Sequence, residues 1–349
     1  MSTEGVRRGF VTDLAPGPGN PRNSEGDTLL LADGRLLLVW TRFRGPEDHA
    51  SADLYACHSA DWGRSWTATY PLISGAEAAQ NVMSVSLLRE RHTGDALLFY
   101  LQKHGPEDLS IWVRRSPDEG HTWGPARRVT ADPGYHVMNN ARVVQTSSGR
   151  LIAPAAVSPR SGGPEPSRAV CYLSDDAGAT WRPGARAVGF VEGDPVQEPG
   201  VVQPRPGGRL FMILRTLRGH VYGAWSGDEG ETWSPPEALV DLPAPAAPAS
   251  VARLPGGALI AAYNHRSDGA TAGWADRTAL ALARSEDEGR TWRRLEGLEP
   301  DPGFCYGYTS LRPYGYQVVL TYYVWPRRGQ RHFQDTTLRV RVLPAERLG

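Results

Sequence analysis

The chain has 349 residues, with 38 Lys plus Arg and 38 Asp plus Glu, so its formal net charge is zero. This balance offers no basic surface to nucleic acid or to an anionic membrane, and we expect neither as a partner. Glycine and proline are abundant, at 39 and 29 residues, and no helical periodicity is sustained. Turn-rich β proteins have this composition.

The sequence carries no sign of a metal, a cofactor or a membrane segment. Cys57, Cys171 and Cys305 give neither a disulfide framework nor metal-ligand spacing, and no phosphate loop, HExxH or CxxC motif is present. The first residues, MSTEGVRRGF, lack the apolar core of a signal peptide, and no apolar run could span a bilayer. A cytoplasmic location is therefore the default expectation, with secretion by another route left open. The oligomeric state is not indicated.

Two short patterns alternate along the chain. An apolar stretch, a glycine turn and a second apolar stretch occur six times, with turn glycines Gly34, Gly94, Gly149, Gly208, Gly257 and Gly315. The phrase Ser-x-Asp-x-Gly-x-Ser/Thr-Trp, which we call the Asp box, occurs five times, from Ser59, Ser116, Ser174, Ser226 and Ser285. These starts lie 57, 58, 52 and 59 residues apart. Such a repeat predicts a solenoid or a propeller.

Each repeat predicts strand, glycine turn, strand, strand, Asp box, strand, which is a four-stranded antiparallel blade. The sixth repeat lacks an Asp box, but TTLRVRVLP supplies a third strand, and GFVTDL near the N-terminus could supply the fourth. We therefore predict an all-β, six-bladed β-propeller that spans residues 1–349 as one domain, closed by its two terminal strands. Five equivalent Asp boxes cannot all face one site, so we interpret them as scaffold.

Polar residues stand where the innermost strands of the predicted blades begin, although a purely structural strand would be apolar there. They are Arg22, Glu25, Asp27, Asn81, Asn139, Asn140, Arg142, Gln197, Glu198, Tyr306 and Tyr308. The inner strands of a propeller surround one axis. A ligand site at this position is favoured over a merely solvated channel.

The Asp boxes, the six predicted blades and the order of these residues resemble the sialidase (neuraminidase) superfamily, and more closely its bacterial branch with BNR repeats. The resemblance covers essentially the whole chain. It implies an exo-glycosidase that removes a terminal sialic acid or a related acidic sugar, with retention of configuration and without a cofactor. The expected partner is a carboxylated glycan or small molecule.

The resemblance also implies roles for individual residues. TRFRGPED matches the family's first Arg and its acid/base Asp, which gives Arg42 and Asp48. Glu198 in VQEPG matches the Glu that opens blade four, and Arg215 in MILRT matches the Arg after it. Arg42 could instead be a surface ion-pair partner, and Glu198 a buried strut that holds an arginine.

Two further residues complete the implied site. DRTALALARSED offers Arg277 as another arginine, and YGYTSL offers Tyr308 as the nucleophile, with Tyr306 as the second choice. Arginine binds both oxygens of a carboxylate with its planar fork. A neutral Tyr with a Glu base avoids the repulsion that an anionic nucleophile would meet beside that carboxylate.

One departure from the family pattern concerns the start of blade one. Sialidases have an Arg-Ile-Pro phrase there, whereas this chain has Arg-Asn-Ser-Glu-Gly. A gapless count back from Gly34 puts Ser24 at the position of the family's Arg, and Arg22 requires a shift of two residues. Either Arg22 reaches the site and Glu25 holds it, or the site uses another group such as Arg142. Glu25 and Asn140 are further candidate binding residues.

The sequence leaves two other functions open. The first is a sialidase-fold enzyme that uses the same acid, base and Tyr on a substrate other than a sialoside. A biosynthetic enzyme is one form of this alternative. The altered phrase at blade one favours it. The second is a non-catalytic, glycan-binding propeller, which the complete set of Asp, Glu and Tyr disfavours.

Overall fold

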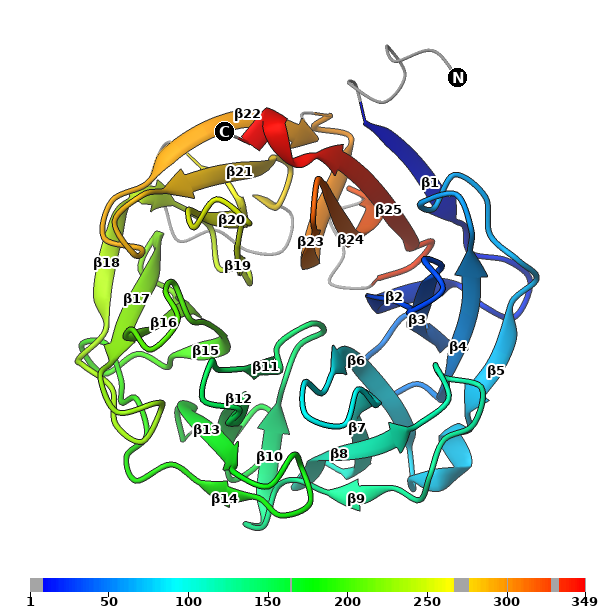
Figure 1. The fold of residues 1–349 in the computed structure, drawn as a ribbon, viewed down its shortest axis with the longest axis horizontal. Coiled ribbons are helices and arrows are strands. Elements are labelled where there is room, and N and C mark those ends of the chain that lie inside the picture. Colours follow the sequence, from blue (N-terminus) through cyan, green and yellow to red (C-terminus); the bar gives the residue numbers. More distant parts are fainter. Residues whose placement is uncertain (1–8, 164, 267–275, 300, 328–332, 349) are drawn as a thin grey trace.

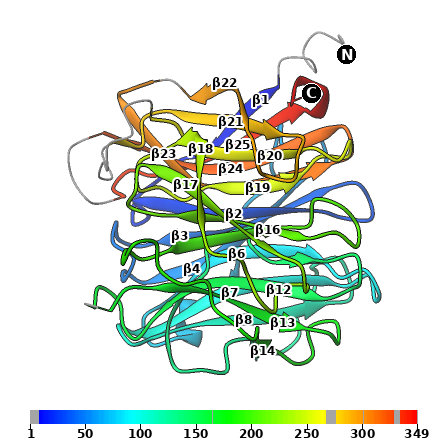
Figure 2. The same cartoon turned by 90° about the vertical axis from the view of Figure 1, so that its left-hand side faces the viewer.

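The computed structural model describes residues 9–163, 165–266, 276–299, 301–327 and 333–348. Nearly every regular element in these ranges is a β-strand, and the 3-10 helices η1 (Gly75–Glu77) and η3 (Ala345–Leu348) have only three and four residues. The predicted all-β class is therefore confirmed. The sheets follow one another around a central axis (Figure 1), and from the side they stack into a thick disc (Figure 2).

Three antiparallel sheets correspond to single repeats of the sequence. The first contains β2 (Arg22–Leu30), β3 (Leu36–Phe43), β4 (Ala52–Ser59) and β5 (Tyr70–Ile73). Another contains β15 (Gln197–Val202), β16 (Leu210–Arg215), β17 (His220–Ser226) and β18 (Glu237–Pro243). The next contains β19 (Ser250–Arg253), β20 (Leu259–Asn264), β21 (Leu280–Ser285) and β22 (Arg293–Glu299). In each, the strand order in space equals the order in the chain, as expected for strands joined by tight turns.

The second and third repeats share one nine-stranded sheet. It contains β6 (Asn81–Arg89), β7 (Ala96–Gly105), β8 (Asp108–Ser116), β9 (Arg127–Arg128), β10 (Gly134–Val137), β11 (Val144–Gln145), β12 (Leu151–Ser158), β13 (Arg168–Ser174) and β14 (Arg182–Pro183). β10 joins the repeats because it pairs parallel with β8 and antiparallel with β12. A separate sheet for each repeat, as the sequence predicts, is therefore not formed here, since the partners of β10 come from two repeats.

The two ends of the chain meet in one sheet. β1 (Phe10–Leu14) pairs antiparallel with β25 (Thr337–Pro344), in the order β1-β25-β24-β23 with β24 (Gln317–Pro326) and β23 (Phe304–Tyr314). Arg339 on β25 forms a bidentate ion pair with Asp13 on β1, with both N–O distances at 2.8 Å. The predicted pairing of GFVTDL with the C-terminal strand is confirmed.

The Asp boxes form five equivalent turns. In each, the Ser hydroxyl donates to the Asp carboxylate and accepts from the Gly N–H, and the Asp also accepts from the Ser or Thr two residues after the Gly. The residue before each Gly is also left-handed, with φ between 55° and 62°. These bonds occupy the Asp side chains, so the Asp boxes are structural, as predicted.

Three of the Asp box glycines also approach the preceding sheet closely. A Cβ added at Gly120 would lie 3.2 Å from Leu37, one at Gly230 would lie 3.3 Å from Ile152, and one at Gly289 would lie 2.9 Å from Phe211. In these boxes glycine thus serves both the turn and the close packing between neighbouring sheets.

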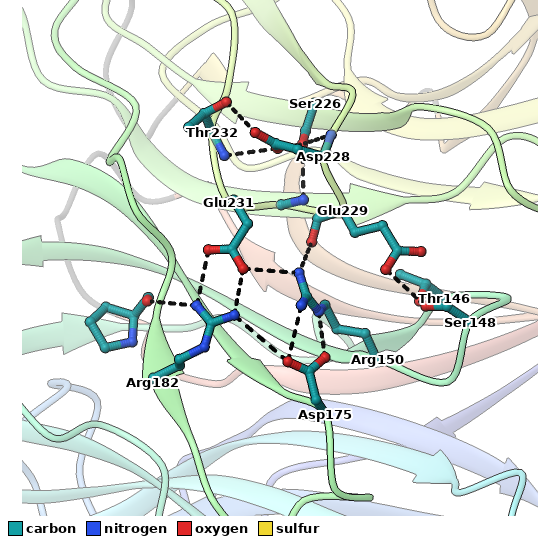
Figure 3. A network of polar contacts seen from close by, with 12 residues as sticks. Thr146, Ser148, Arg150, Asp175, Arg182, Ser226, Asp228, Glu229, Glu231 and Thr232 are labelled. Carbon is teal, nitrogen blue, oxygen red and sulfur yellow. Dashed lines mark hydrogen bonds and ion pairs between the residues drawn. The ribbon is translucent and has the colours of Figure 1, made fainter.

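Charged side chains reinforce one of the same junctions. Arg150, which precedes β12, binds Asp175 with an N–O distance of 2.6 Å and Glu231 with one of 3.2 Å (Figure 3). Glu229, from the same Asp box as Glu231, accepts from the Ser148 hydroxyl at 2.9 Å. The Asp box of β17–β18 is thereby tied to the glycine turn of the sheet before it.

The close contact between Gly289 and Phe211 predicts the effect of adding one methyl group at this glycine. Gly289→Ala should lower the free energy of unfolding more than Gly34→Ala, because both glycines have positive φ, at 88° and 85°, but only Gly289 meets a buried ring. A left-handed alanine costs about 1–2 kcal/mol in either place. Overpacking against Phe211 should add about 1–3 kcal/mol. Urea unfolding of both variants measures the difference, and equal midpoints would show that the glycine contact is not needed.

Candidate active site

A cavity of about 590 Å³ opens at the end of the disc where the innermost strands begin. Eight of the predicted residues line it: Arg22, Glu25, Asp48, Asn139, Gln197, Glu198, Arg215 and Tyr308. They come from the first, third, fourth and last repeats, which are far apart in the chain. Arg277 lies behind Tyr308, and its guanidinium carbon is 5.4 Å from the centre of that ring.

The inner strands carry a shared irregularity at this level. The register of β2, β6, β15 and β23 shifts once near its start, as in a β-bulge. One residue inside each bulge is left-handed, namely Glu25 (φ 54°), Ser84 (φ 60°), Glu198 (φ 48°) and Tyr308 (φ 56°). All four line the cavity. The bulges therefore aim these side chains toward the axis, at a conformational cost of about 1–2 kcal/mol each.

Arg22 is the central cation of the first sheet's side of the cavity. It is only 1% exposed, and its guanidinium lies 4.1 Å from the ring centre of Phe43 and 4.3 Å from that of Phe333. Its Nη1 donates to Asp48 Oδ1 at 2.6 Å, and its Nη2 lies 3.9 Å from Glu25 Oε1. Although burial disfavours the charge, these two carboxylates raise the pKa of Arg22, so it stays a cation.

Asp48 is more accessible than Glu25 and Glu198, with 51% of its side chain exposed against 9% and 8%. Its loop is fixed from the second sheet: Asn81 donates to the carbonyls of Asp48 and Ala50 at 3.1 and 2.8 Å, and Lys103 Nζ donates to the Asp48 carbonyl at 3.3 Å. The carboxylate can therefore meet a ligand while its backbone is held.

Glu25 belongs to the wall of the cavity. Its Oε2 accepts from the Ser84 N–H at 2.9 Å and from the Thr41 hydroxyl at 3.2 Å. Burial raises the pKa of Glu25, and the charge of Arg22 opposes that effect. The sequence left two alternatives: Arg22 in the site with Glu25 holding it, or another group such as Arg142. The geometry places Arg22 in the cavity with Glu25 beside it.

Glu198, Arg215 and Tyr308 face each other from two sheets. Arg215 Nη1 donates to Glu198 Oε2 at 2.8 Å, and both side chains are nearly buried. The Tyr308 ring stacks on Tyr323 at 4.7 Å and is 8% exposed. Burial, and then the charge of Glu198, raise the pKa of Tyr308 to about 12, while Arg277 and Arg215 act in the opposite direction. At neutral pH Tyr308 is thus a neutral phenol.

Two predicted binding residues, Arg42 and Asn140, lie outside the cavity lining. Arg42 follows Thr41 on β3, and since Thr41 faces Glu25, Arg42 points to the other face of the strand, where its guanidinium lies 4.8 Å from the Tyr55 ring centre. Asn140 donates to the carbonyls of Gly26 and Tyr308 at 2.8 and 3.1 Å, which ties two inner strands together.

Arg142 and Tyr306 also differ from the prediction. Arg142 donates to the Ser250 hydroxyl at 3.0 Å and lines a second cavity at the opposite end of the inner strands. Tyr306, the second choice for the nucleophile, is packed in an apolar cluster, with its hydroxyl 3.4 Å from the Asp301 carbonyl. A regular strand would put Tyr306 and Tyr308 on the same face, but the bulge in β23 separates them, and they pack in different clusters.

The reasoning from sequence missed one side of the cavity, because it searched only for polar groups. The second and third repeats supply an apolar wall of Met83, Leu101, Leu109, Tyr135 and Val137. Tyr135 and Val137 lie on β10, whose pairing gave no sequence signal. In the described ranges, no cluster of three or more His, Cys, Asp or Glu is placed to hold a metal ion.

The ring of sheets and its axial cavity define an all-β propeller protein with an arginine- and carboxylate-lined site. The chain belongs to the sialidase/BNR superfamily: the family described as "BNR repeat-like domain" matches residues 34–316. No helix among the described residues is both long and apolar enough to cross a membrane.

Relatives of known name agree with this family. The chain is 29% identical over 205 residues to human Sialidase-4 (51% of this chain, 42% of the relative). It is 28% identical over 308 residues to a sialidase of Micromonospora viridifaciens (79% of this chain, 45% of the relative). The chain thus spans less than half the length of each. The structure of the Hadza microbial sialidase Hz136 matches with a TM-score of 0.75 at 18% identity, over 97% of this chain and 68% of that one.

The environment of Tyr308 leads to a prediction about its pKa. Glu198→Gln should lower the pKa of Tyr308 below about 12, because a neighbouring negative charge disappears and Arg215 and Arg277 remain. NMR of tyrosines labelled with ¹³C at Cζ measures it, with Tyr308→Phe for assignment. Tyr306 is the internal control, since burial, Glu299 and Asp301 raise its pKa to about 12. An unchanged pKa of Tyr308 in Glu198→Gln would contradict the electrostatic interaction between Tyr308 and Glu198.

Proposed function

We propose that the protein is a sialidase-like, retaining exo-glycosidase that acts on a terminal sialic acid or a related acidic sugar. The observation that carries the proposal is the convergence of Asp48, Glu198 and Tyr308 with two arginines on one cavity, and of Arg277 on the Tyr308 ring. The sialidase relatives support the same class at low identity.

In this proposal Arg22 and Arg215, which line the cavity, bind the substrate carboxylate, and Arg277 acts from behind the Tyr308 ring. The Tyr308 hydroxyl attacks the anomeric carbon, Glu198 accepts its proton, and Asp48 protonates the leaving oxygen. A water molecule that Asp48 deprotonates then attacks the same carbon, and Tyr308 leaves and regains its proton. The pKa of Tyr308 requires such a base, because burial and Glu198 keep the phenol neutral near pH 7.

The ion pair between Arg22 and Asp48 fits this sequence of steps. Arg22 Nη1 holds Asp48 Oδ1 at 2.6 Å, and the same guanidinium is proposed to bind the substrate carboxylate. A substrate carboxylate that takes over Arg22 would free Asp48 Oδ1 to face the leaving oxygen. Substrate binding and the position of the Asp48 side chain would then be coupled through one guanidinium.

We also propose that the domain spans residues 1–349 and has six blades, five of them with an Asp box. On this interpretation the nine-stranded sheet is two blades joined by β10, and the β1–β25 pairing closes the ring. The four strands of each repeat support this count.

A second candidate is an enzyme of the same fold whose substrate is not a sialoside, and Glu25 favours it. This carboxyl is 7% exposed and lies beside Arg22, so it adds negative charge next to the proposed carboxylate pocket. Inactivity of the wild-type protein on every sialoside, together with loss of another activity in Asp48→Asn, would select this candidate.

The covalent step is tested by mass spectrometry. A 2,3-difluoro sialic acid probe should add its glycosyl mass to Tyr308, and Tyr308→Phe should prevent the adduct, because the attacking oxygen is gone. Asp48→Asn should lower kcat on a fluorogenic sialoside by about 10²–10⁴. Asp33→Asn, at an exposed glycine turn, is the matched control and should keep full activity. Full activity of Tyr308→Phe would exclude the mechanism.

Kinetic measurements distinguish which of the first sheet's two candidate arginines, Arg22 and Arg42, binds the substrate. Arg22→Met should raise KM by roughly 10- to 100-fold, since charge-assisted hydrogen bonds contribute about 1.5–3 kcal/mol. Arg42→Met should leave KM nearly unchanged, because Arg42 lies over Tyr55 outside the cavity. Thermal melting of both variants reports whether they fold. A larger effect of Arg42→Met would reverse the assignment.

A further inference from the structure

Lys103 is the only lysine of the chain, and 37 arginines make up the rest of its 38 basic residues. It lies on β7 in the nine-stranded sheet and is 5% exposed. A buried ammonium costs free energy, and an apolar side chain of similar length would avoid that cost. Packing alone therefore does not account for a lysine at this position.

This lysine lies next to the wall of the candidate active site. Leu101, which lines the cavity, precedes it by two residues in a regular stretch of β7, so both side chains point to the same face. Asn81 on β6 stands directly opposite Lys103 in the ladder. The Lys103 Nζ lies 5.5 Å from the ring centre of Tyr135, another residue of the cavity lining.

The polar partner of Lys103 is the main chain of Asp48. Nζ donates to the Asp48 carbonyl at 3.3 Å, and Asn81 Nδ2 donates to the same oxygen at 3.1 Å and to the Ala50 carbonyl at 2.8 Å. In the described part of the chain, Nζ contacts this carbonyl and the Tyr135 ring, not a carboxylate. A compact ammonium fits beside the Asn81 amide at one shared oxygen, whereas a guanidinium would bring five N–H groups that need partners.

Different groups thus hold the side chain and the main chain of Asp48. Arg22 holds the carboxylate through Nη1 at 2.6 Å. In the proposed function the substrate carboxylate takes over Arg22, and that contact is lost. Lys103 and Asn81 are outside the cavity lining, so a ligand in the cavity leaves their bonds to the carbonyl in place.

We propose that Lys103 is a positioning residue for Asp48, whose main chain it holds while Arg22 binds the substrate. This role rests on the proposed function, in which Asp48 protonates the leaving oxygen. Proton transfer requires the carboxyl group within about 2.6–3.2 Å of that oxygen. A displacement of about 1 Å can cost about 10²-fold in rate. Lys103 itself touches neither the substrate nor the reacting atoms.

The leaving group of the substrate separates this role from a general loss of stability. A sugar alkoxide is a poor leaving group and needs a proton, whereas 4-methylumbelliferone leaves as a stable anion and needs it less. Lys103→Met removes the ammonium and keeps the length of the side chain. It should lower kcat/KM on 3′-sialyllactose by about 100-fold, and on the 4-methylumbelliferyl sialoside by about tenfold or less.

Arg114→Met is the matched control, because it removes a cation from the same sheet away from the cavity. Arg114 lies on β8, where it pairs with Glu77 at 2.7 Å. Its loss should change kcat/KM on the two substrates by the same factor. Equal losses on both substrates in Lys103→Met, or no loss on either, would overturn the positioning role and leave the proposed function intact.

Hydrogen exchange of residues 44–51, the loop that carries Asp48, tests the contact without a substrate. Two amides of this loop donate to main-chain carbonyls within it. Their exchange should be faster in Lys103→Met than in the wild type and unchanged in Arg114→Met. Unchanged exchange in Lys103→Met would show that the lysine does not hold the loop. If the wild-type protein hydrolyses neither sialoside, the proposed function fails, and the role of Lys103 in acid catalysis fails with it.

Discussion

The left-handed residue within the bulge of each of four inner strands is the constraint on which the candidate site depends. An ordinary strand alternates its side chains regularly between two faces, whereas Glu25, Ser84, Glu198 and Tyr308 each lie in a bulge of a different inner strand and line the same cavity. The bulge adds one residue and turns a side chain inward. Each such residue is strained, and the surrounding sheets must be rigid enough to hold it.

That rigidity comes from the outer part of the disc. The Asp boxes close their turns with hydrogen bonds of their own, and three of their glycines lie close against the preceding sheet. Arg150 and its carboxylate partners add ion pairs across one junction (Figure 3). The Asp of the Asp box is thus fully engaged in the frame, while the chemistry lies at the axis on residues from other parts of each repeat.

Buried charge is arranged in compensating groups. Arg22 lies between Asp48 and Glu25, and Arg215 pairs with Glu198. Each of these two buried arginines therefore has a carboxylate partner. Phe43, Tyr323 and Phe333 surround Arg22 with rings, which lowers the local polarity and strengthens these pairs. Arg142, farther along the axis, has a hydroxyl as its partner and, among the described residues, no carboxylate in hydrogen-bonding contact.

Much of the architecture could be predicted from the sequence alone, because glycine turns, Asp boxes and apolar strands are encoded within a few adjacent residues. The β1–β25 pairing and the choice of Asp48, Glu198, Arg215 and Tyr308 for one cavity follow from that repeat and the family resemblance. Only the tertiary structure decided that Arg22 lines the cavity and Arg42 does not. A count along the chain assumes a regular ladder, whereas Glu25 and Gly26 together stand opposite the single residue Trp40. A bulge is a relation between two strands, so its effect on side-chain direction appears only when they pair.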